Sequence, residues 1–143
     1  MSFDFALGLA PFLWLMAGTP PAASLEVDIE RLRNARGDLH LCLTRDPAHF
    51  PDCKGDPRAV ARTVPASTRS VRFDGLPPGG YALSILHDEN RNRKLDTTLA
   101  IPREGFGFSR NPVVRFGAPK FRQVVIDLPA GFTRQRVRMQ YLL

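Results

Sequence analysis

The sequence predicts an all-β fold, an antiparallel β-sandwich of about seven strands. Short runs in which apolar and polar residues alternate have the period of half-buried strands. The 13 Pro and 11 Gly lie largely between these runs, as expected where turns join short strands. No long segment carries the apolar stripe of an amphipathic helix. With 143 residues, the chain is long enough for one domain whose core needs no metal or disulfide cage.

A signal peptide over residues 1–23 is expected ahead of this domain. Residues 5–18 are an apolar run, FALGLAPFLWLMAG, followed by small residues. A membrane-spanning helix needs about 20 apolar residues, so the run fits a secretory signal better, although no Lys or Arg precedes it. The alternative is a buried first helix. Cleavage after Ala23 or Ser24 would leave one periplasmic or secreted domain, residues 24–143, with no membrane span.

Seven strands are expected in that domain. The first two, at residues 25–29 and 39–43, alternate Leu, Val or Ile with polar residues, and turn residues lie between them, so we expect them to pair as a hairpin. A turn of Gly and Pro at residues 75–80 separates the third strand from the fourth. The remaining strands are expected at residues 71–73, 81–85, 113–116, 124–128 and 137–142.

Residues 87–112 form a long excursion between two expected strands, and loops of that length are uncommon unless they are functional or internally braced. Oxygen-bearing side chains take positions 1, 3, 5 and 9 of an EF-hand-like count, and a backbone carbonyl takes position 7. These candidate Ca²⁺ ligands are Asp88, Asn90, Asn92, Lys94 (backbone) and Asp96.

Two elements of a Ca²⁺ loop are missing from this count. Position 6 is Arg93 where Gly is usual, and position 12 is Leu99 where a bidentate Glu is usual. Glu104 supplies the missing carboxylate only if the chain folds back, and the basic residues Arg91, Arg93 and Lys94 must point outward. The alternative is a metal-free loop in which Asp and Asn side chains accept hydrogen bonds from backbone N–H groups.

The stretch FDGLPPGGYALSILHDENRNRKLDTTLAIPREGFGFSRN, followed by FGAPKF, resembles the bacterial secreted domain-of-unknown-function family 2141. The resemblance is close from residue 71 to about residue 128 and looser in the flanking strands. It implies a signal peptide and an immunoglobulin-like or transthyretin-like sandwich, and it implies no established reaction. The sequence departs from the family pattern at Arg91, Arg93 and Ala100, where relatives usually have Gly.

Cys42 and Cys53 are the only two cysteines, and we expect them to form a structural disulfide. An oxidising compartment outside the cytoplasm would favour their pairing. The alternatives are free thiols and a redox or metal site that would recruit His40 and His49. The spacing lacks the CxxC pattern typical of such sites.

A candidate ligand surface combines His87, an aromatic group and a basic stripe. Phe106, Phe108, Phe116 and Phe121 follow the acidic loop and are expected either to form a ligand platform or to pack as the private core of the excursion. Arg134, Arg136 and Arg138 share one face of the last strand. They suit an anionic envelope glycan or lipopolysaccharide, or simply a solvated edge that resists aggregation.

The formal net charge is +6, and 17 of the 20 basic residues are Arg. Charge alone would suit nucleic acid, but the expected export excludes it. We therefore expect a non-catalytic binding or structural module of the bacterial envelope, with Ca²⁺ as its one candidate cofactor. The alternatives are a periplasmic glycan- or lipopolysaccharide-binding module and a small hydrolase centred on His87, Asp88 and Glu89.

Overall fold

The computed structural model describes Leu15, residues 18–98 and residues 101–143. Most of the expected signal peptide, residues 1–23, lies outside the described residues, and so do Leu99 and Ala100. Within the described part, no helix is long and apolar enough to cross a membrane.

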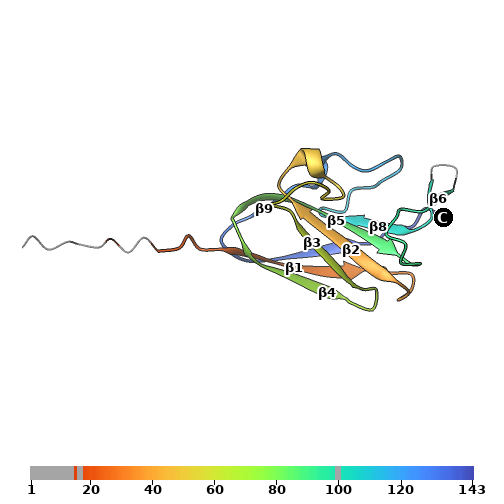
Figure 1. The fold of residues 1–143 in the computed structure, drawn as a ribbon, viewed down its shortest axis with the longest axis horizontal. Coiled ribbons are helices and arrows are strands. Elements are labelled where there is room, and N and C mark those ends of the chain that lie inside the picture. Colours follow the sequence, from red (N-terminus) through yellow and green to blue (C-terminus); the bar gives the residue numbers. More distant parts are fainter. Residues whose placement is uncertain (1–14, 16–17, 99–100) are drawn as a thin grey trace, which may run out of the picture.

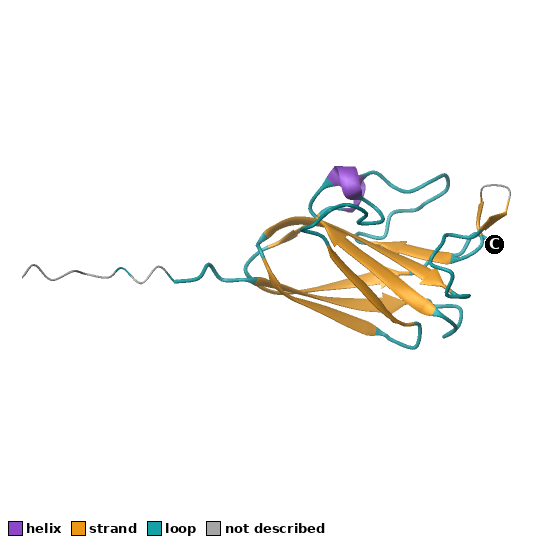
Figure 2. Cartoon of the chain, viewed as in Figure 1, coloured by secondary structure: helices purple, strands orange, loops and turns teal. Residues whose placement is uncertain are grey.

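Over the described residues the chain forms ten strands, one 3-10 turn and one short α-helix (Figures 1 and 2). Seven of the strands have four or more residues, and two of these seven, β3 and β8, are not among the seven expected strands. In chain order the elements are β1 (Ala23–Glu30), β2 (Asp38–Thr44), η1 (Pro47–His49), β3 (Val60–Pro65), β4 (Ser70–Leu76), β5 (Gly79–Asp88), β6 (Thr97–Thr98), β7 (Ile101–Pro102), β8 (Gly105–Phe108), α1 (Phe121–Val124), β9 (Ile126–Leu128) and β10 (Gly131–Arg138).

Two sheets pack face to face, which confirms the predicted all-β sandwich (Figure 1). One sheet has the order β10-β1-β4, and the other has the order β3-β2-β5-β8, with β9 also paired to β5. β6 and β7 form a separate hairpin. The pairing is antiparallel except between β1 and β10, which run parallel in a continuous register from Ala23–Gly131 to Glu30–Arg138.

The expected hairpin between the first two strands is wrong. β1 pairs with β4 and β10, whereas β2 pairs with β3 and β5. The apolar residues of both strands meet in one core from opposite sheets, and all of them are at most 3% exposed. Alternation shows which side of each strand is buried, but it is the same for strands in one sheet and strands in facing sheets.

Two further expectations about strands were wrong, and two strands were missed. Residues 113–116 form a loop, and β10 begins at Gly131, six residues before the expected start. β3 was missed because Arg62, on the same side of the strand as Val60 and Val64, is an exposed charged residue that interrupts the apolar pattern. β8 lies inside the 87–112 excursion, and its sequence GFGF has no polar alternation because all four residues are buried.

The glycines of β8 permit close approach of the C-terminal chain. A Cβ on Gly107 would lie 2.7 Å from Val137 and 2.9 Å from the sulfur of Met139. A Cβ on Gly105 would clash with the ring of Tyr141. Residues 137–141 therefore cross directly over β8, and this crossing fixes the chain on the C-terminal side of the excursion.

A second apolar cluster covers the outer face of the larger sheet. It comprises Ala82, Phe106, Phe108, Val114 and Val124, with Phe50 and Phe121 packed against it. Its cover comes from two segments, the cysteine loop (residues 45–58) and the segment around α1. Figure 2 shows both lying over the same side of the sandwich.

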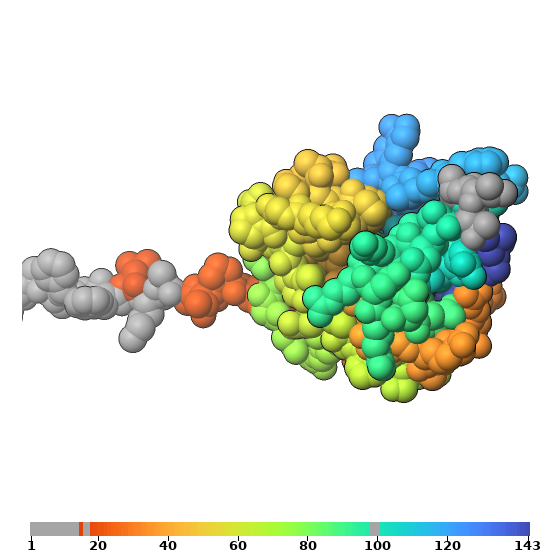
Figure 3. Space-filling model, turned by 45° about the vertical axis from the view of Figure 1, so that its right-hand side comes forward, coloured from red at the N-terminus to blue at the C-terminus, as the bar shows by residue number. Residues whose placement is uncertain are grey.

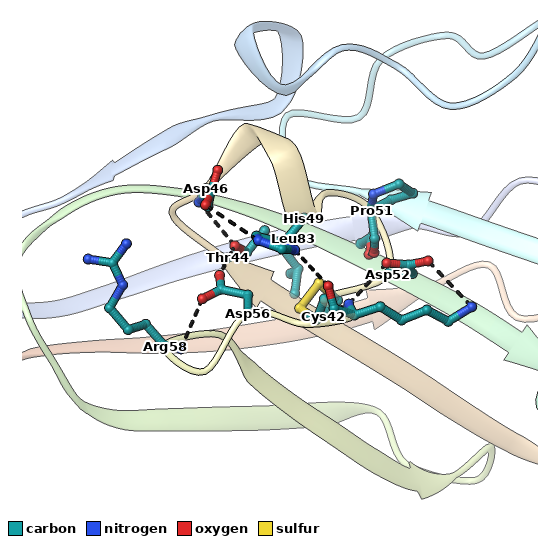
Figure 4. The surroundings of a disulfide bond; sticks show 12 residues. Cys42, Thr44, Asp46, His49, Pro51, Asp52, Asp56, Arg58 and Leu83 are labelled. Atoms are coloured by element: carbon teal, nitrogen blue, oxygen red, sulfur yellow. Dashed lines mark hydrogen bonds and ion pairs between the residues drawn. A yellow bond between two sulfur atoms is a disulfide. The ribbon is translucent and has the colours of Figure 1, made fainter.

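The predicted disulfide between Cys42 and Cys53 is confirmed, with the two Cα atoms 5.6 Å apart. It ties the cysteine loop to β2 (Figure 4). The hydroxyl of Thr44 donates to Asp56 Oδ2 at 2.7 Å, and the hydroxyl of Ser84 donates to the carbonyl of Pro51. These bonds hold the loop against the larger sheet, where it shields the second cluster.

Candidate functional site

The acidic loop, residues 88–96, begins at the last residue of β5. Asp88 is completely buried, and its carboxylate accepts three hydrogen bonds. Asn92 N–H donates to Oδ1 at 3.1 Å, and Arg93 N–H and His40 Nε2 reach Oδ2 at 2.8 Å each. Burial raises the pKa of Asp88, but the hydrogen bonds from His40, Arg93 and Asn92 outweigh burial and lower the pKa overall. Asp88 is therefore a carboxylate that fixes the shape of the loop.

The remaining oxygen-bearing side chains of the loop converge on Asp96. The amide of Asn90 donates to Asp96 Oδ2 at 2.7 Å, and the amide of Asn92 donates to Oδ1 at 2.8 Å. Hydrogen bonds from Asn92 and Asn90 lower the pKa of Asp96. The amide oxygens of the same two residues accept backbone N–H groups, from Asn92 and Lys94 respectively. The loop thus adopts the hydrogen-bonded turns of the metal-free alternative. The amide nitrogens of Asn90 and Asn92 meet the Asp96 carboxylate, and their oxygens accept backbone N–H groups.

Arg91 and Arg93 take the conformation that suits glycine. Their φ angles are +57° and +59°, in the left-handed region. Residues with a Cβ adopt this region at a cost of about 1–2 kcal/mol. Arg93 is the residue at position 6, where the Ca²⁺-loop count calls for Gly. The backbone therefore follows the sharp turn of such a loop although the residue type differs.

Glu104 folds back to the acidic loop. It directly precedes β8, is 4% exposed, and its Oε2 accepts the N–H of Asp96 at 3.4 Å. Burial raises the pKa of Glu104, and the charges of Asp96 and Asp88 raise it further. The arrangement places a second carboxylate beside Asp96. Glu104 thus stands in for the Glu that is missing at position 12 of the Ca²⁺-loop count.

The basic residues of the loop do not neutralise these carboxylates. Arg91 Nε lies 3.4 Å from Asp38. Among the residues that the structure describes, neither Asp96 nor Glu104 has a Lys, Arg or His within 4.0 Å. In the same described part, no three His, Cys, Asp or Glu side chains form a metal-binding group. Any cation held here would depend on amide and backbone oxygens as well as carboxylates.

A polar cavity of about 270 Å³ opens beside the loop. Its lining carries both signs of charge: Arg33, Arg36 and Arg103 with Glu89, Asn90, Asp96 and Glu104. Figure 3 shows this part of the chain, in green, beside the orange segment that contains Arg33 and Arg36. Asp96 and Glu104 therefore have access to a space larger than one ion.

Glu89 braces the wall of this cavity. Arg33 Nε donates to its Oε1 at 2.7 Å, and Asn34 and Arg36 reach its Oε2 at 3.2 and 3.3 Å. Burial raises the pKa of Glu89, but the hydrogen bonds from Asn34 and Arg33 lower it overall. Gly37, at a φ of +74°, packs on the backbone of residues 88 and 89, where a Cβ would clash. Glu89 thus joins the β1–β2 turn to the acidic loop.

His87 does not lie on a ligand surface, contrary to the expectation. It is completely buried, and its ring nitrogens lie 2.8 Å from the hydroxyl of Tyr141 and 2.7 Å from the carbonyl of Arg36. Because successive side chains of a strand point to opposite faces, His87 and Asp88 diverge. Glu89 is held by Arg33. The three residues of the hydrolase alternative therefore do not share one site.

Sequence reasoning missed Tyr141, and it considered His40 only as a partner of the cysteines and not of Asp88. His40 joins Asp88 to the hydroxyl of Thr63, which lies 2.9 Å from its Nδ1. These three hydrogen-bonded residues are of the types found in a catalytic triad. Among the described residues, however, Thr63 lines neither the cavity beside the acidic loop nor the one formed by residues 20–22 and 75–78. The contact follows from the pairing of β2 with both β3 and β5, which no local pattern predicts.

The aromatic residues divide between core and surface. Phe106 and Phe108 are 8% and 5% exposed, so they form the packed core of the excursion and not a ligand platform. Phe121 packs edge-on against Phe50 in the same cluster. Phe116 is 97% exposed. The expected cluster therefore lacks Phe116 and gains Phe50 from the cysteine loop.

The basic stripe on β10 is matched by an acidic stripe on β1. The parallel register places Arg134, Arg136 and Arg138 opposite Glu26, Asp28 and Glu30. Arg134 lies 3.1 Å from Glu26 and 3.6 Å from Asp28, and the other two arginines lie 3.9 Å from Glu30. Equal numbers of opposite charges leave this face without the excess positive charge that a glycan or lipopolysaccharide surface would need.

Comparison with known families matches residues 27–136 to the family described as "Uncharacterized protein conserved in bacteria (DUF2141)". No curated protein and no solved structure matches the chain. The matched segment is well over half of the chain and contains the acidic loop, Glu104 and both cysteines. The resemblance seen in the motifs is thereby confirmed, and the chain belongs to the DUF2141 family of uncharacterised bacterial proteins.

Proposed function

We propose that the protein is an exported, non-catalytic β-sandwich module of the bacterial envelope whose acidic loop binds Ca²⁺ and is ordered by it. One observation carries the cation proposal. Asp96 and Glu104 adjoin each other without a basic side chain within 4.0 Å among the described residues, in a chain with 17 Arg. Two adjacent carboxylates repel each other unless a cation or a proton lies between them.

The surrounding groups supply the remaining ligands by their chemistry. Ca²⁺ takes six to eight oxygen ligands from carboxylates, amides, backbone carbonyls and water. Asn90 and Asn92 direct their amide nitrogens at Asp96. Rotation of these amides would present oxygen to an ion in the same place, at the cost of the hydrogen bonds that their oxygens accept from backbone N–H groups. The neighbouring cavity leaves room for water. The carboxylate of Asp88 already accepts three hydrogen bonds that shape the loop, so it has at most one further lone pair to offer a cation.

The proposal of a non-catalytic role rests on the state of the candidate catalytic groups. Both nitrogens of His87 have partners, and Asp88 and Glu89 are each held by three donors. A general base needs a free site within reach of the proton it removes. These groups stabilise the junction between the acidic loop, the β1–β2 turn and the C-terminal chain.

Two features support export. The disulfide suits an oxidising compartment, and residues 5–18 have the apolar character of a signal sequence. Ala23 is fully buried in β1, and the carbonyl of Ala22 accepts the N–H of Gly131 at 3.1 Å. Cleavage after Ala23 would remove part of this pairing. N-terminal sequencing of the protein recovered from the periplasm would test export and locate the cleavage site.

Ca²⁺ binding is tested by thermal unfolding of a chain that begins at Gly18. All ten strands and both apolar clusters lie at or after Ala23, so this chain contains the complete described fold. With 1 mM Ca²⁺ and a dissociation constant of about 0.1 mM, binding would stabilise the fold by about 1.4 kcal/mol. The melting temperature should rise by about 5 °C relative to EDTA. No shift at 1 mM or at 5 mM Ca²⁺ would overturn the proposal.

Glu104→Gln gives the matched test. Without Ca²⁺ this variant should melt at a higher temperature than the parent chain, because it removes a buried charge that Asp96 and Asp88 disfavour. With Ca²⁺ it should lose most of the shift. Asp127→Asn, at an exposed position on β9, serves as the control and should retain the full response.

A further inference from the structure

The segment between β8 and α1 presents two unusually exposed apolar side chains. Phe116 is 97% exposed and Val113 is 81% exposed, more than any other large apolar side chain in the described residues from Ala23 onward. Figure 1 shows this segment, in blue, as a loop that extends above the larger sheet. We call residues 109–122 the basic arm.

Both ends of the basic arm are anchored to the sandwich, so the exposed position of its tip is fixed by the fold. The hydroxyl of Ser109 donates to the carbonyl of Val124 at 2.5 Å. Asn111 bonds to β10 twice, through the carbonyl of Arg136 at 2.9 Å and the N–H of Arg138 at 2.8 Å. Val114 is only 9% exposed and packs in the second cluster. With the arm fixed in this way, Val113 and Phe116 remain outside.

The arm also carries positive charge that no acidic residue of its own segment offsets. No Asp or Glu occurs between Glu104 and Asp127, whereas this interval contains Arg110, Arg115, Lys120 and Arg122. All four are exposed. None of them lies within 4.0 Å of a carboxylate among the described residues, in contrast to the paired arginines of β10. The partner of this surface should therefore be anionic as well as apolar.

We propose that the basic arm docks on an anionic phospholipid bilayer, with Val113 and Phe116 inserted at the boundary between headgroups and acyl chains. The four basic side chains then lie at the level of the headgroup phosphates. A bilayer supplies anionic and apolar partners at adjacent depths. A hydrated polyanion such as a glycan supplies only the charge, and a Phe without a polar group gains little from it. The proposal concerns a surface that shares no residue with the acidic loop, and it does not depend on Ca²⁺.

The experiment uses Phe116→Trp in the chain that begins at Gly18. The sequence contains one Trp, at position 14, so the introduced Trp is the sole reporter. Vesicles of phosphatidylethanolamine with about a quarter phosphatidylglycerol should shift its emission to shorter wavelength in low salt and EDTA. Vesicles of phosphatidylcholine alone should not. Raising the salt to about 0.5 M should weaken binding several-fold, because it screens the headgroup charge. EDTA separates this result from the outcome of the Ca²⁺ test.

Co-sedimentation of label-free variants separates insertion from simple charge attraction. Phe116→Ser should weaken binding to the anionic vesicles by about tenfold or more, because it removes a buried apolar side chain from the bound state. Phe132→Ser is the matched control, since Phe132 is 54% exposed on β10 between Arg72 and Arg134. The control should bind like the parent chain. Arg115→Ser should weaken binding by about fivefold in low salt.

Three outcomes would overturn the proposal. They are absence of binding to anionic vesicles, equal binding of the Phe116→Ser and parent chains, and equal binding to phosphatidylcholine. Soluble dextran sulfate is also added as a competitor of vesicle binding. If it displaced the parent chain and the Phe116→Ser chain equally well, the arm would be assigned to a polyanion instead of a bilayer. Because the side chain of Phe116 is almost fully exposed, its variants should keep the melting temperature of the parent chain. If the melting temperature of Phe116→Ser fell strongly, Val113→Ser would take its place in the binding comparison.

Discussion

The hydroxyl of Tyr141 donates a hydrogen bond to Nδ1 of His87, with the two atoms 2.8 Å apart. This direction is that of the neutral ring, in which Nε2, 2.7 Å from the carbonyl of Arg36, is the donor and Nδ1 is therefore the acceptor. Tyr141 in turn accepts the N–H of Arg33 at 3.2 Å, and the guanidinium of Arg33 stacks over its ring. The C-terminal chain is therefore joined to β5 and to the β1–β2 turn through one phenol.

Removal of this hydroxyl should destabilise the fold. Tyr141→Phe leaves Nδ1 of the buried His87 and the N–H of Arg33 without a partner, which should lower the free energy of unfolding by about 1–3 kcal/mol. Urea denaturation of the variant and the parent chain measures this difference. An unchanged free energy would show that water replaces the phenol and that His87 is more accessible than its burial indicates.

The disulfide should stabilise the protein through the cysteine loop. Replacing both Cys42 and Cys53 with Ser should cost about 3 kcal/mol, because the bond closes a short loop with a sequence separation of 11. The loop covers Phe108 through Phe50, so protease cleavage between residues 45 and 58 should become faster. Dithiothreitol should destabilise the parent chain by a similar amount and leave the double variant unchanged. Equal stability of the two chains would refute the effect.

Arg93→Gly should stabilise the acidic loop. Glycine removes the cost of a Cβ at a φ of +59° but loses more conformational entropy on folding, which leaves a net gain of about 0.5–1 kcal/mol. Arg93→Ala keeps the Cβ and is the control, which should show no gain. Urea midpoints of the three chains in EDTA provide the measurement. If the alanine variant gained as much as the glycine variant, the benefit would come from the lost charge and not from the backbone.

Asp56 should make the protein more sensitive to acid. The hydrogen bond from Thr44 and that from the N–H of Arg58 lower its pKa below the ordinary value of 3.8. A carboxylate with a lowered pKa stabilises the fold above its ordinary pKa, and this contribution is lost as the pH falls through the folded value. Asp56→Asn should therefore be less stable than the parent chain at pH 7, and the two should converge near pH 2. A difference that persists at low pH would contradict the linkage.

The sequence indicated which side of a strand is buried but not which strands pair with each other. Alternation identified the buried side of residues 25–29 and 39–43, and both predictions are correct. It assigned these strands to one hairpin because nearby strands usually pair, yet they lie in opposite sheets. β8 has no alternation, because the second cluster buries its outer face as well. That cover comes from residues distant in the chain, which a local pattern does not contain.

The sequence predicted which side chains meet in the acidic loop but not how they are arranged. The spacing of Asp88, Asn90, Asn92 and Asp96 predicted convergent oxygens. Asn90 and Asn92 do meet Asp96, but through their amide nitrogens, so cation binding by their oxygens stays a prediction. Whether Glu104 folded back depended on the position of β8, which the sequence did not indicate. The contact of His40 with Asp88 depended on strand pairing for the same reason. In the sequence Phe116 looked equivalent to Phe106 and Phe108. The rings of Phe106 and Phe108 are buried because they lie on the sheet face that the second cluster covers, whereas Phe116 lies outside this cluster.

The parallel pairing of β1 with β10 has a consequence for how the chain reaches its final state. The first strand of the domain finds one of its two neighbours only when the last strand is present, and the pair joins residues as far apart as Glu26 and Arg134. Contacts this distant in sequence slow folding. A chain that leaves the ribosome with β10 still unmade should therefore stay unfolded for longer.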